Sequence, residues 1–134
     1  MLSQKQPLIL RFADADPAGV VFYPRAIAIA HDAVEDLIRA STLGWAAWFA
    51  SPIHVIPLRQ AEAEFFRPMR PGQELTTRAA VENLGRTSVT FLVEFFDKSG
   101  QASARVRTTH VLVDKATGQP IPLTEDIRSA LLSG

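Results

Sequence analysis

The 134-residue sequence contains no cysteine, so it can form no disulfide, no thiolate nucleophile and no thiolate metal site. It has no apolar run long enough to cross a bilayer, and residues 1–7 lack the apolar core of a secretory signal. It has no excess of charge, because fourteen basic and fourteen acidic residues cancel. Without a global positive field, neither nucleic acid nor an anionic membrane is an expected partner. These absences together predict a cytoplasmic protein.

Several common catalytic motifs are also missing. There is no glycine-rich phosphate loop ending in Lys-Ser or Lys-Thr, and no serine lies in a glycine-flanked nucleophile elbow. The three histidines, His31, His54 and His110, lie far apart, and no two have the spacing of helical metal ligands. Phosphoryl transfer and serine-hydrolase chemistry are therefore excluded, and no metal site is expected.

The hydrophobic patterns predict one α+β domain spanning residues 1–134. Beyond Pro24, a residue suited to the first turn of a helix, apolar and charged positions separate at helical spacing. The apolar stripe is read as Ile27, His31, Val34 and Ile38, and the opposite side as Asp32, Glu35, Asp36 and Arg39. Residues 41–52 predict an irregular connection or a short helical turn.

Most of the remaining chain has the period-two alternation of half-buried strands. Strands are predicted over 8–12, 53–66, 75–82, 89–95 and 102–106, and a short terminal helix over 123–132. The order is strand, long helix, four strands, helix, which indicates an antiparallel sheet wrapped around the long helix. One helix covers only part of one sheet face, so the uncovered face and the sheet edges favour a homo-oligomer.

The loop from Phe12 to Pro24 contains the groups in this sequence that are best suited to catalysis. Its free amides at a helix start carry partial positive charge and could hold a thioester carbonyl and its oxyanion, with Gly19 allowing close backbone approach. A carboxylate beside them, Asp14 or Asp16, could attack the carbonyl or deprotonate a water. The alternative is that both aspartates only cap turns or the helix, and the Asp-x-Asp-Pro pattern alone favours that alternative.

Residues 14–24, DADPAGVVFYP, resemble the signature of the 4-hydroxybenzoyl-CoA thioesterase family of hotdog proteins. The likeness extends more loosely through the segments 65–68, 85–91 and 114–120. It implies a hotdog fold in which Asp16 is the catalytic carboxylate and the Tyr23 backbone amide contacts the oxyanion, while Asp14 is structural. It also implies an acyl-CoA substrate, no metal or redox cofactor, and a homodimer or homotetramer with active sites at the dimer interface.

The chain departs from the family just after this signature, where Arg25 and Ala26 replace an Asn and an aromatic residue. His31 lies where relatives often carry an acidic residue, so it is either a contact to the acyl group or a neutral core histidine. The cluster Trp45, Trp48 and Phe49 either lines an aryl pocket or belongs to the core.

Basic residues beside turns are candidates for holding the CoA phosphates: Arg67, Arg70 and Arg86. The resemblance favours Arg86 and its neighbour Thr87 among them, and surface exposure is the alternative for each arginine. The expected function is hydrolysis of an aryl or short-chain acyl-CoA. An acyl-ACP thioesterase and a non-catalytic acyl-CoA binding module are the alternatives; a hotdog hydratase is disfavoured because its closely spaced Asp and His are absent.

Overall fold

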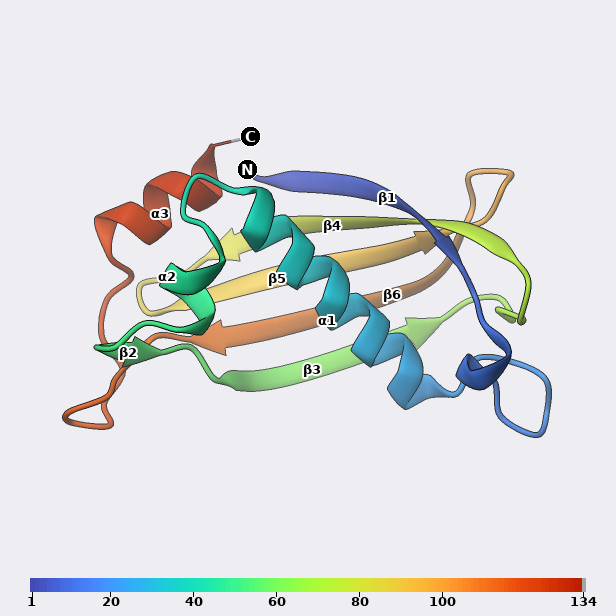
Figure 1. The fold of residues 1–134 in the computed structure, drawn as a ribbon, viewed down its shortest axis with the longest axis horizontal. Helices are drawn as coiled ribbons and strands as arrows, with labels where there is room; N and C mark the ends of the chain where they lie inside the picture. The colour runs from blue at the N-terminus through green and yellow to red at the C-terminus, as the bar shows by residue number, and fades with distance from the viewer. Residues whose placement is uncertain (134) are drawn as a thin grey trace.

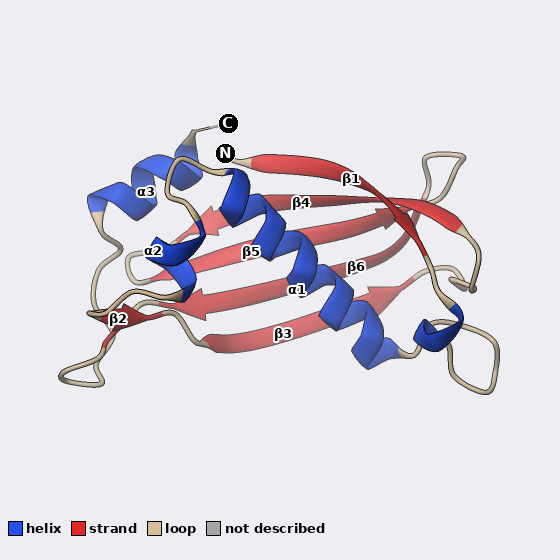
Figure 2. Ribbon diagram, in the orientation of Figure 1, coloured by secondary structure: helices blue, strands red, loops and turns tan. Residues whose placement is uncertain are grey.

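A curved five-stranded antiparallel sheet wraps around one long helix, α1 (Figures 1 and 2). The structure is a computed structural model that describes residues 1–133. In chain order the elements are β1 (Ser3–Ile9), the 3-10 turn η1 (Phe12–Asp14), α1 (Tyr23–Ala40), α2 (Trp45–Phe49), β2 (His54–Val55), β3 (Leu58–Phe65), β4 (Glu74–Leu84), β5 (Ser88–Phe96), β6 (Ala102–Val111), β7 (Val113–Asp114) and α3 (Glu125–Leu132). The predicted α+β hotdog architecture is confirmed.

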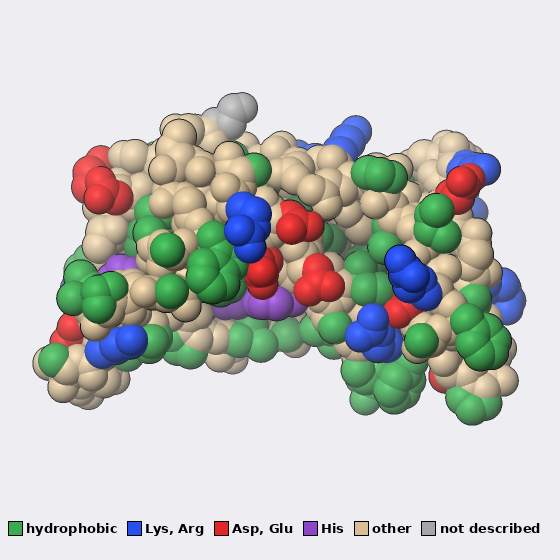
Figure 3. All heavy atoms as spheres, in the orientation of Figure 1, with side chains coloured by type: hydrophobic (Ala, Val, Ile, Leu, Met, Phe, Trp, Pro, Cys, Tyr) green, Lys and Arg blue, Asp and Glu red, His purple; other side chains and the backbone are tan. Residues whose placement is uncertain are grey.

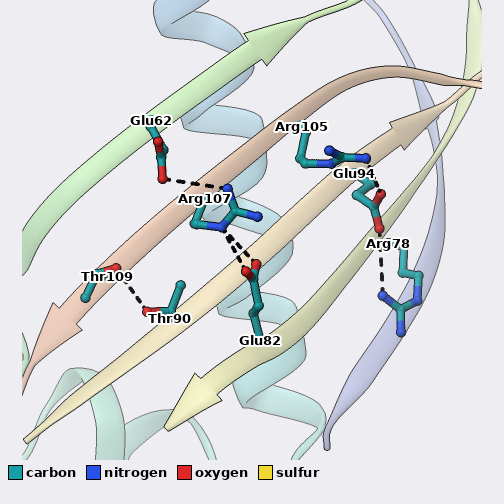
Figure 4. A network of polar contacts seen from close by, with 8 residues as sticks. All are labelled: Glu62, Arg78, Glu82, Thr90, Glu94, Arg105, Arg107 and Thr109. Atoms are coloured by element: carbon teal, nitrogen blue, oxygen red, sulfur yellow. Dashed lines mark hydrogen bonds and ion pairs between the residues drawn. The ribbon is translucent and has the colours of Figure 1, made fainter. Parts of the chain in front are cut away.

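The sheet has the strand order β1-β4-β5-β6-β3, and β2 pairs separately with β7. Alternation along the central strands separates two faces: Val89, Phe91, Val93 and Phe95 of β5 are buried beneath α1, whereas the residues between them are half-buried on the outer face. The outer face carries a ladder of ion pairs, in which Arg107 lies between Glu62 and Glu82 (Figure 4). The apolar core therefore lies between the sheet and α1.

The predicted strands have different bounds in the structure: the one over 102–106 continues to Val111, and those over 75–82 and 89–95 extend one or two residues further at their ends. Two others differ more. The predicted strand over 8–12 ends at Ile9 and begins earlier, at Ser3, because residues 3–9 pair with β4 while Phe12 enters the turn η1. The predicted strand over 53–66 is divided into β2 and β3 at Ile56 and Pro57. A proline has no N–H for a strand ladder, and the Pro57 carbonyl instead accepts the Val111 amide at 3.1 Å.

The predicted long helix is confirmed, but its buried stripe was misassigned in part. Val34 and Ile38 are buried as expected, together with Ala26, Ala30 and Leu37, whereas Ile27 is half-buried and His31 is exposed. The stripe is rotated toward the small alanines, because their short side chains let the helix approach the sheet closely. His31 consequently lies beside the core rather than in it.

Candidate functional site

Asp14 anchors the loop that leads into α1. Its side chain is only 7% exposed, and its Oδ2 accepts the Arg11 amide at 2.8 Å while Oδ1 accepts Nε and Nη2 of Arg25 at 3.1 and 2.9 Å. The Asp14 carbonyl also accepts the amide of Phe22, the N-cap residue of α1, at 2.8 Å. Burial raises the pKa of Asp14, but the hydrogen bonds and positive charges of Arg11 and Arg25 outweigh it and hold the pKa below 3.8. Asp14 is thus a fixed carboxylate that ties both ends of the loop together.

Asp16 is held more loosely, within a tight turn of the same loop. Its Oδ1 accepts the Ala18 amide at 2.9 Å, and its carbonyl accepts the Gly19 amide at 2.9 Å. Gly19 has φ = +80°, a conformation that glycine adopts without steric cost, so it closes the turn but its N–H is already used. Within residues 1–133 no hydrogen bond reaches Oδ2 of Asp16. The carboxylate therefore caps the turn with one oxygen and leaves the other for chemistry.

Helix α1 begins with an open backbone donor. Its N-cap Phe22 offers no side-chain cap, and the amides of Arg25 and Ala26 donate to the Phe22 carbonyl at 2.8 and 3.3 Å. Pro24 has no N–H. Among the residues that the structure describes, none accepts the Tyr23 amide, which leaves it pointing from the positive end of an 18-residue helix. Such an amide suits a developing oxyanion.

A cavity of about 830 Å³ begins at Pro24 and follows α1 past Ile27 to His31. Its volume lies within the range of small-molecule sites. The other walls come from α2, the segment 50–58 and the end of β6. Trp48 and Phe49 both line it, so two of the three clustered aromatic residues face an open space as well as the core. An apolar cavity with aromatic walls next to a helix start suits a flat acyl group.

All three histidines line this cavity, although the sequence separates them widely. In Figure 3, histidine side chains reach the surface beside α1 among hydrophobic side chains. The ring of His31 meets Phe49 edge-on at 6.1 Å between centroids, so His31 is a cavity residue and not a core histidine. Within residues 1–133, no cluster of three His, Cys, Asp or Glu side chains has the geometry to hold a metal ion.

His110 is enclosed and fully hydrogen-bonded. Its Nε2 pairs with Thr108 Oγ1 at 3.2 Å, and its ring bonds the backbone of Ile56. Burial lowers the pKa of His110, the Ile56 bond opposes that shift, and the charge of His31 lowers the pKa further. Burial thus favours the uncharged form of His110 in this wall of the cavity.

His54 differs from His110 in having an unpaired nitrogen. It is 8% exposed, its backbone amide donates to Ser51 Oγ at 3.4 Å, and its Nδ1 has no partner in the part of the chain that the structure describes. Sequence reasoning missed both His54 and His110 as site residues. No local signal could have found them, because strand pairing and the turn at Pro57 bring them to the cavity.

The predicted site residues fall into two groups at opposite ends of β3. The Val21 amide donates to the Met69 carbonyl at 2.7 Å, which places the start of α1 with Asp16 and Tyr23 just beyond the Phe65 end. At the Leu58 end, Leu58 pairs with His110, which pairs with Val89, two residues after Thr87. A single chain therefore does not bring Arg86 and Thr87 to Asp16.

The arginines at the Phe65 end differ in their contacts. Nη1 of Arg70 approaches the Gly19 carbonyl at 3.5 Å, so Arg70 lies beside the turn that holds Asp16. Arg67 forms an exposed ion pair with Asp97 at 3.8 Å. Arg86 is exposed at the other end, and its carbonyl accepts the Leu123 amide at 2.9 Å. Of these three arginines, Arg70 is thus the one that contacts the turn holding the candidate carboxylate.

Comparison with known proteins shows the family. Residues 10–131 match the model of the thioesterase-like superfamily. The chain is 31% identical over 126 residues to a 1,4-dihydroxy-2-naphthoyl-CoA hydrolase from Rippkaea orientalis, covering 92% of this chain and 91% of that protein. It is also 31% identical over 127 residues to the enzyme of the same name from Trichodesmium erythraeum, covering 93% and 92%.

The fold is shared with solved thioesterases. The crystal structure of a 1,4-dihydroxy-2-naphthoyl-CoA thioesterase from Synechocystis superposes with a TM-score of 0.88 at 23% identity, covering 98% of this chain and 96% of that one. No helix among residues 1–133 is long and apolar enough to span a membrane. The chain belongs to the thioesterase-like superfamily and is a thioester hydrolase with the hotdog fold.

Proposed function

We propose that the protein hydrolyses an aryl acyl-CoA thioester, with Asp16 as the catalytic carboxylate and the Tyr23 amide as the oxyanion donor. The observation that carries the proposal is the open Tyr23 amide, which lies between the Asp16 turn and a cavity whose wall begins at the next residue, Pro24. A thioester carbonyl at the helix start would extend its acyl group along α1 into that cavity.

Two routes use the same geometry. In the nucleophilic route, Asp16 attacks the carbonyl carbon, the C–S bond breaks to release CoA thiolate, and water hydrolyses the resulting mixed anhydride. In the general-base route, Asp16 takes a proton from the attacking water, and the thiolate leaves as the tetrahedral intermediate collapses. In both, negative charge develops on the carbonyl oxygen, where the Tyr23 amide and the dipole of α1 stabilise it. Neither route requires a metal or redox cofactor.

The aromatic walls support an aryl acyl group. Trp48 and Phe49 offer flat apolar faces, and the relatives from R. orientalis and T. erythraeum are named for a two-ring aryl-CoA. The direct experiment is a kcat/KM panel of 1,4-dihydroxy-2-naphthoyl, 4-hydroxybenzoyl, benzoyl, phenylacetyl and straight-chain acyl-CoA. Preference for an aryl-CoA supports the proposal. Hydrolysis of acyl-ACP but not acyl-CoA, or binding without turnover, would contradict it.

A second copy of the chain, paired antiparallel along β3, would complete the site. Both sheet edges are open, but β1 carries Lys5 and Pro7, which discourage strand addition, whereas β3 contains neither residue type. Every residue of β3 except Ala63 is exposed, including Leu58 and Phe65 at 53% and 44%. Because antiparallel pairing exchanges strand ends, the end of the partner that carries Thr87 would lie beside this chain's Asp16 turn.

The absence of cysteine makes this pairing easy to test. In an antiparallel pair of identical strands, the two-fold axis passes between one residue and its own copy, whose Cα atoms are about 4.5–5.5 Å apart, within disulfide range. Single variants Gln60→Cys, Ala61→Cys and Glu62→Cys are compared under mild oxidation, with Lys5→Cys on β1 as the control. Efficient cross-linking at one central β3 position supports the dimer, and cross-linking at none of them would contradict it.

A further inference from the structure

The start of α1 lacks the features that hold the start of α3. Thr124 caps α3 by accepting the Ile127 amide at 3.2 Å, and two acidic residues follow in the first turn of that helix. Helix α1 has no side-chain cap and no acidic residue in its first turn, which instead contains Arg25. A positive charge is unfavourable at the positive end of a helix, so Arg25 needs a compensating partner there.

The partner of Arg25 is Asp14. Its Oδ1 accepts Nε and Nη2 of Arg25 at 3.1 and 2.9 Å, and its carbonyl accepts the Phe22 amide at 2.8 Å. The Arg25 side chain is 51% exposed but that of Asp14 only 7%, so solvent screens this pair less than an ion pair between two exposed side chains. Asp14 thus holds residues 22 and 25, on either side of Tyr23.

The other contacts of the loop stop short of the first turn of α1. The Asp16 amide donates to the Val20 carbonyl at 2.9 Å, and the Val21 amide donates to the Met69 carbonyl at 2.7 Å. These bonds fix the Asp16 turn and the residues just before the helix. Among the described residues, the only side-chain hydrogen bonds that join residues 12–22 to α1 are the two from Arg25 to Asp14. The first turn of α1 is therefore tied to the loop through Arg25.

We infer that Arg25 is a positioning residue that, through Asp14, fixes the direction of the Tyr23 amide relative to the Asp16 turn. The inference rests on the proposed function, which gives the Tyr23 amide the role of oxyanion donor. Such a donor must lie about 2.7–3.1 Å from the developing oxyanion, and a misplacement of about 1 Å can cost about a hundredfold in rate. Arg25 thus acts on the transition state without touching the substrate.

The test compares Arg25→Ala with Arg25→Lys, using the best aryl-CoA substrate of the wild type. Arg25→Ala lowers kcat and kcat/KM together by about tenfold or more and leaves KM within about twofold, because the lost positioning matters only in the transition state. Arg25→Lys keeps the charge and one donor for Asp14, so its kcat lies between those of Arg25→Ala and the wild type. The control is Arg78→Ala on the outer face, which removes an arginine paired with the partly buried Glu94 at 3.9 Å and leaves kcat unchanged (Figure 4).

A second readout needs no substrate: hydrogen exchange of the Phe22 amide, followed by NMR. This amide donates to the Asp14 carbonyl, so its exchange is faster in Arg25→Ala than in the wild type and unchanged in Arg78→Ala. If Arg25→Ala does not fold, Arg25→Gln, which keeps most of the side chain without its charge, is measured instead.

Wild-type kcat in folded Arg25→Ala, wild-type exchange of its Phe22 amide, or an equal loss of kcat in Arg78→Ala would each overturn the inference. Failure of the proposed function looks different. It would appear as a wild type that hydrolyses no aryl-CoA, or as full kcat in Asp16→Asn, and the exchange comparison would still test whether Arg25 holds the helix start.

Discussion

Replacing Asp14 by Asn separates the structural aspartate from the candidate catalytic one. The carboxylate is 7% exposed and accepts hydrogen bonds from the Arg11 amide and the Arg25 guanidinium. In asparagine an NH2 group replaces one of the two carboxylate oxygens, so a hydrogen-bond donor would face another donor. Hydrogen bonds to a charged group contribute about 1.5–3 kcal/mol each, but Arg25 is 51% exposed and solvent screens its share. We therefore expect Asp14→Asn to lower the free energy of unfolding by about 2 kcal/mol at neutral pH.

For a chain of this length, that loss corresponds to a Tm lower by about 7 °C. Tm is measured by calorimetry at a fixed protein concentration, because an oligomer's stability depends on concentration. Asp32→Asn is the matched control: it makes the same charge change at an exposed position of α1, and it should stay within about 0.5 kcal/mol of the wild type.

The pH dependence follows from the lowered pKa of Asp14. A carboxyl group whose pKa is lower in the folded state stabilises the fold above its ordinary pKa of 3.8, and that contribution is lost as pH falls through the lowered value. The difference between wild type and Asp14→Asn should therefore be constant from pH 7 to about 5 and shrink below about pH 4. Equal stability of the two proteins at pH 7, or a gap that widens toward acid, would refute this reasoning.

Three further variants test other parts of the site. His31→Ala should change the ranking of acyl-CoA substrates by kcat/KM, and an unchanged ranking would remove His31 from the binding site. Arg86→Ala should raise KM several-fold at low salt and weaken its salt dependence if Arg86 holds a CoA phosphate; identical salt curves would argue against that role. Gly19→Ala places a β-carbon on a residue with φ = +80°, so it should lower the free energy of unfolding by about 1 kcal/mol or more and also lower kcat. The control Gly118→Ala, at φ = +70°, should lower the free energy of unfolding but leave kcat unchanged. Equal kcat losses in both glycine variants would assign the effect to stability alone.

The sequence predicts the features of this fold that depend on local periodicity. Alternation in 75–82 and 89–95 marked β4 and β5, and helical spacing after Pro24 marked α1. The separation of apolar and charged residues along a helix does not specify how far the helix is rotated against its sheet. For this reason His31 was assigned to the buried stripe. In the structure, the alanines set that rotation because only they allow close packing.

The sequence indicated the helix start and one part of the cavity, through His31, Trp48 and Phe49, but not the opposite wall. The family resemblance singled out Asp16 and Tyr23 because their signature is continuous in sequence. The convergence of His54 and His110 depends on the β3–β6 register and on a turn at Pro57, and neither leaves a local pattern. The Asp14–Arg25 ion pair likewise joins residues across a loop, at a spacing that no regular element predicts.

The proposed mechanism depends most on Asp16 as the catalytic carboxylate. The most direct measurement is kcat of Asp16→Asn on the best aryl-CoA substrate, together with the affinity of the variant for the product acid. We predict a loss in kcat of at least about a hundredfold, the scale expected for removing a positioned base or nucleophile, with product affinity within about threefold of the wild type. A variant that retains wild-type kcat would contradict the assignment of catalysis to Asp16.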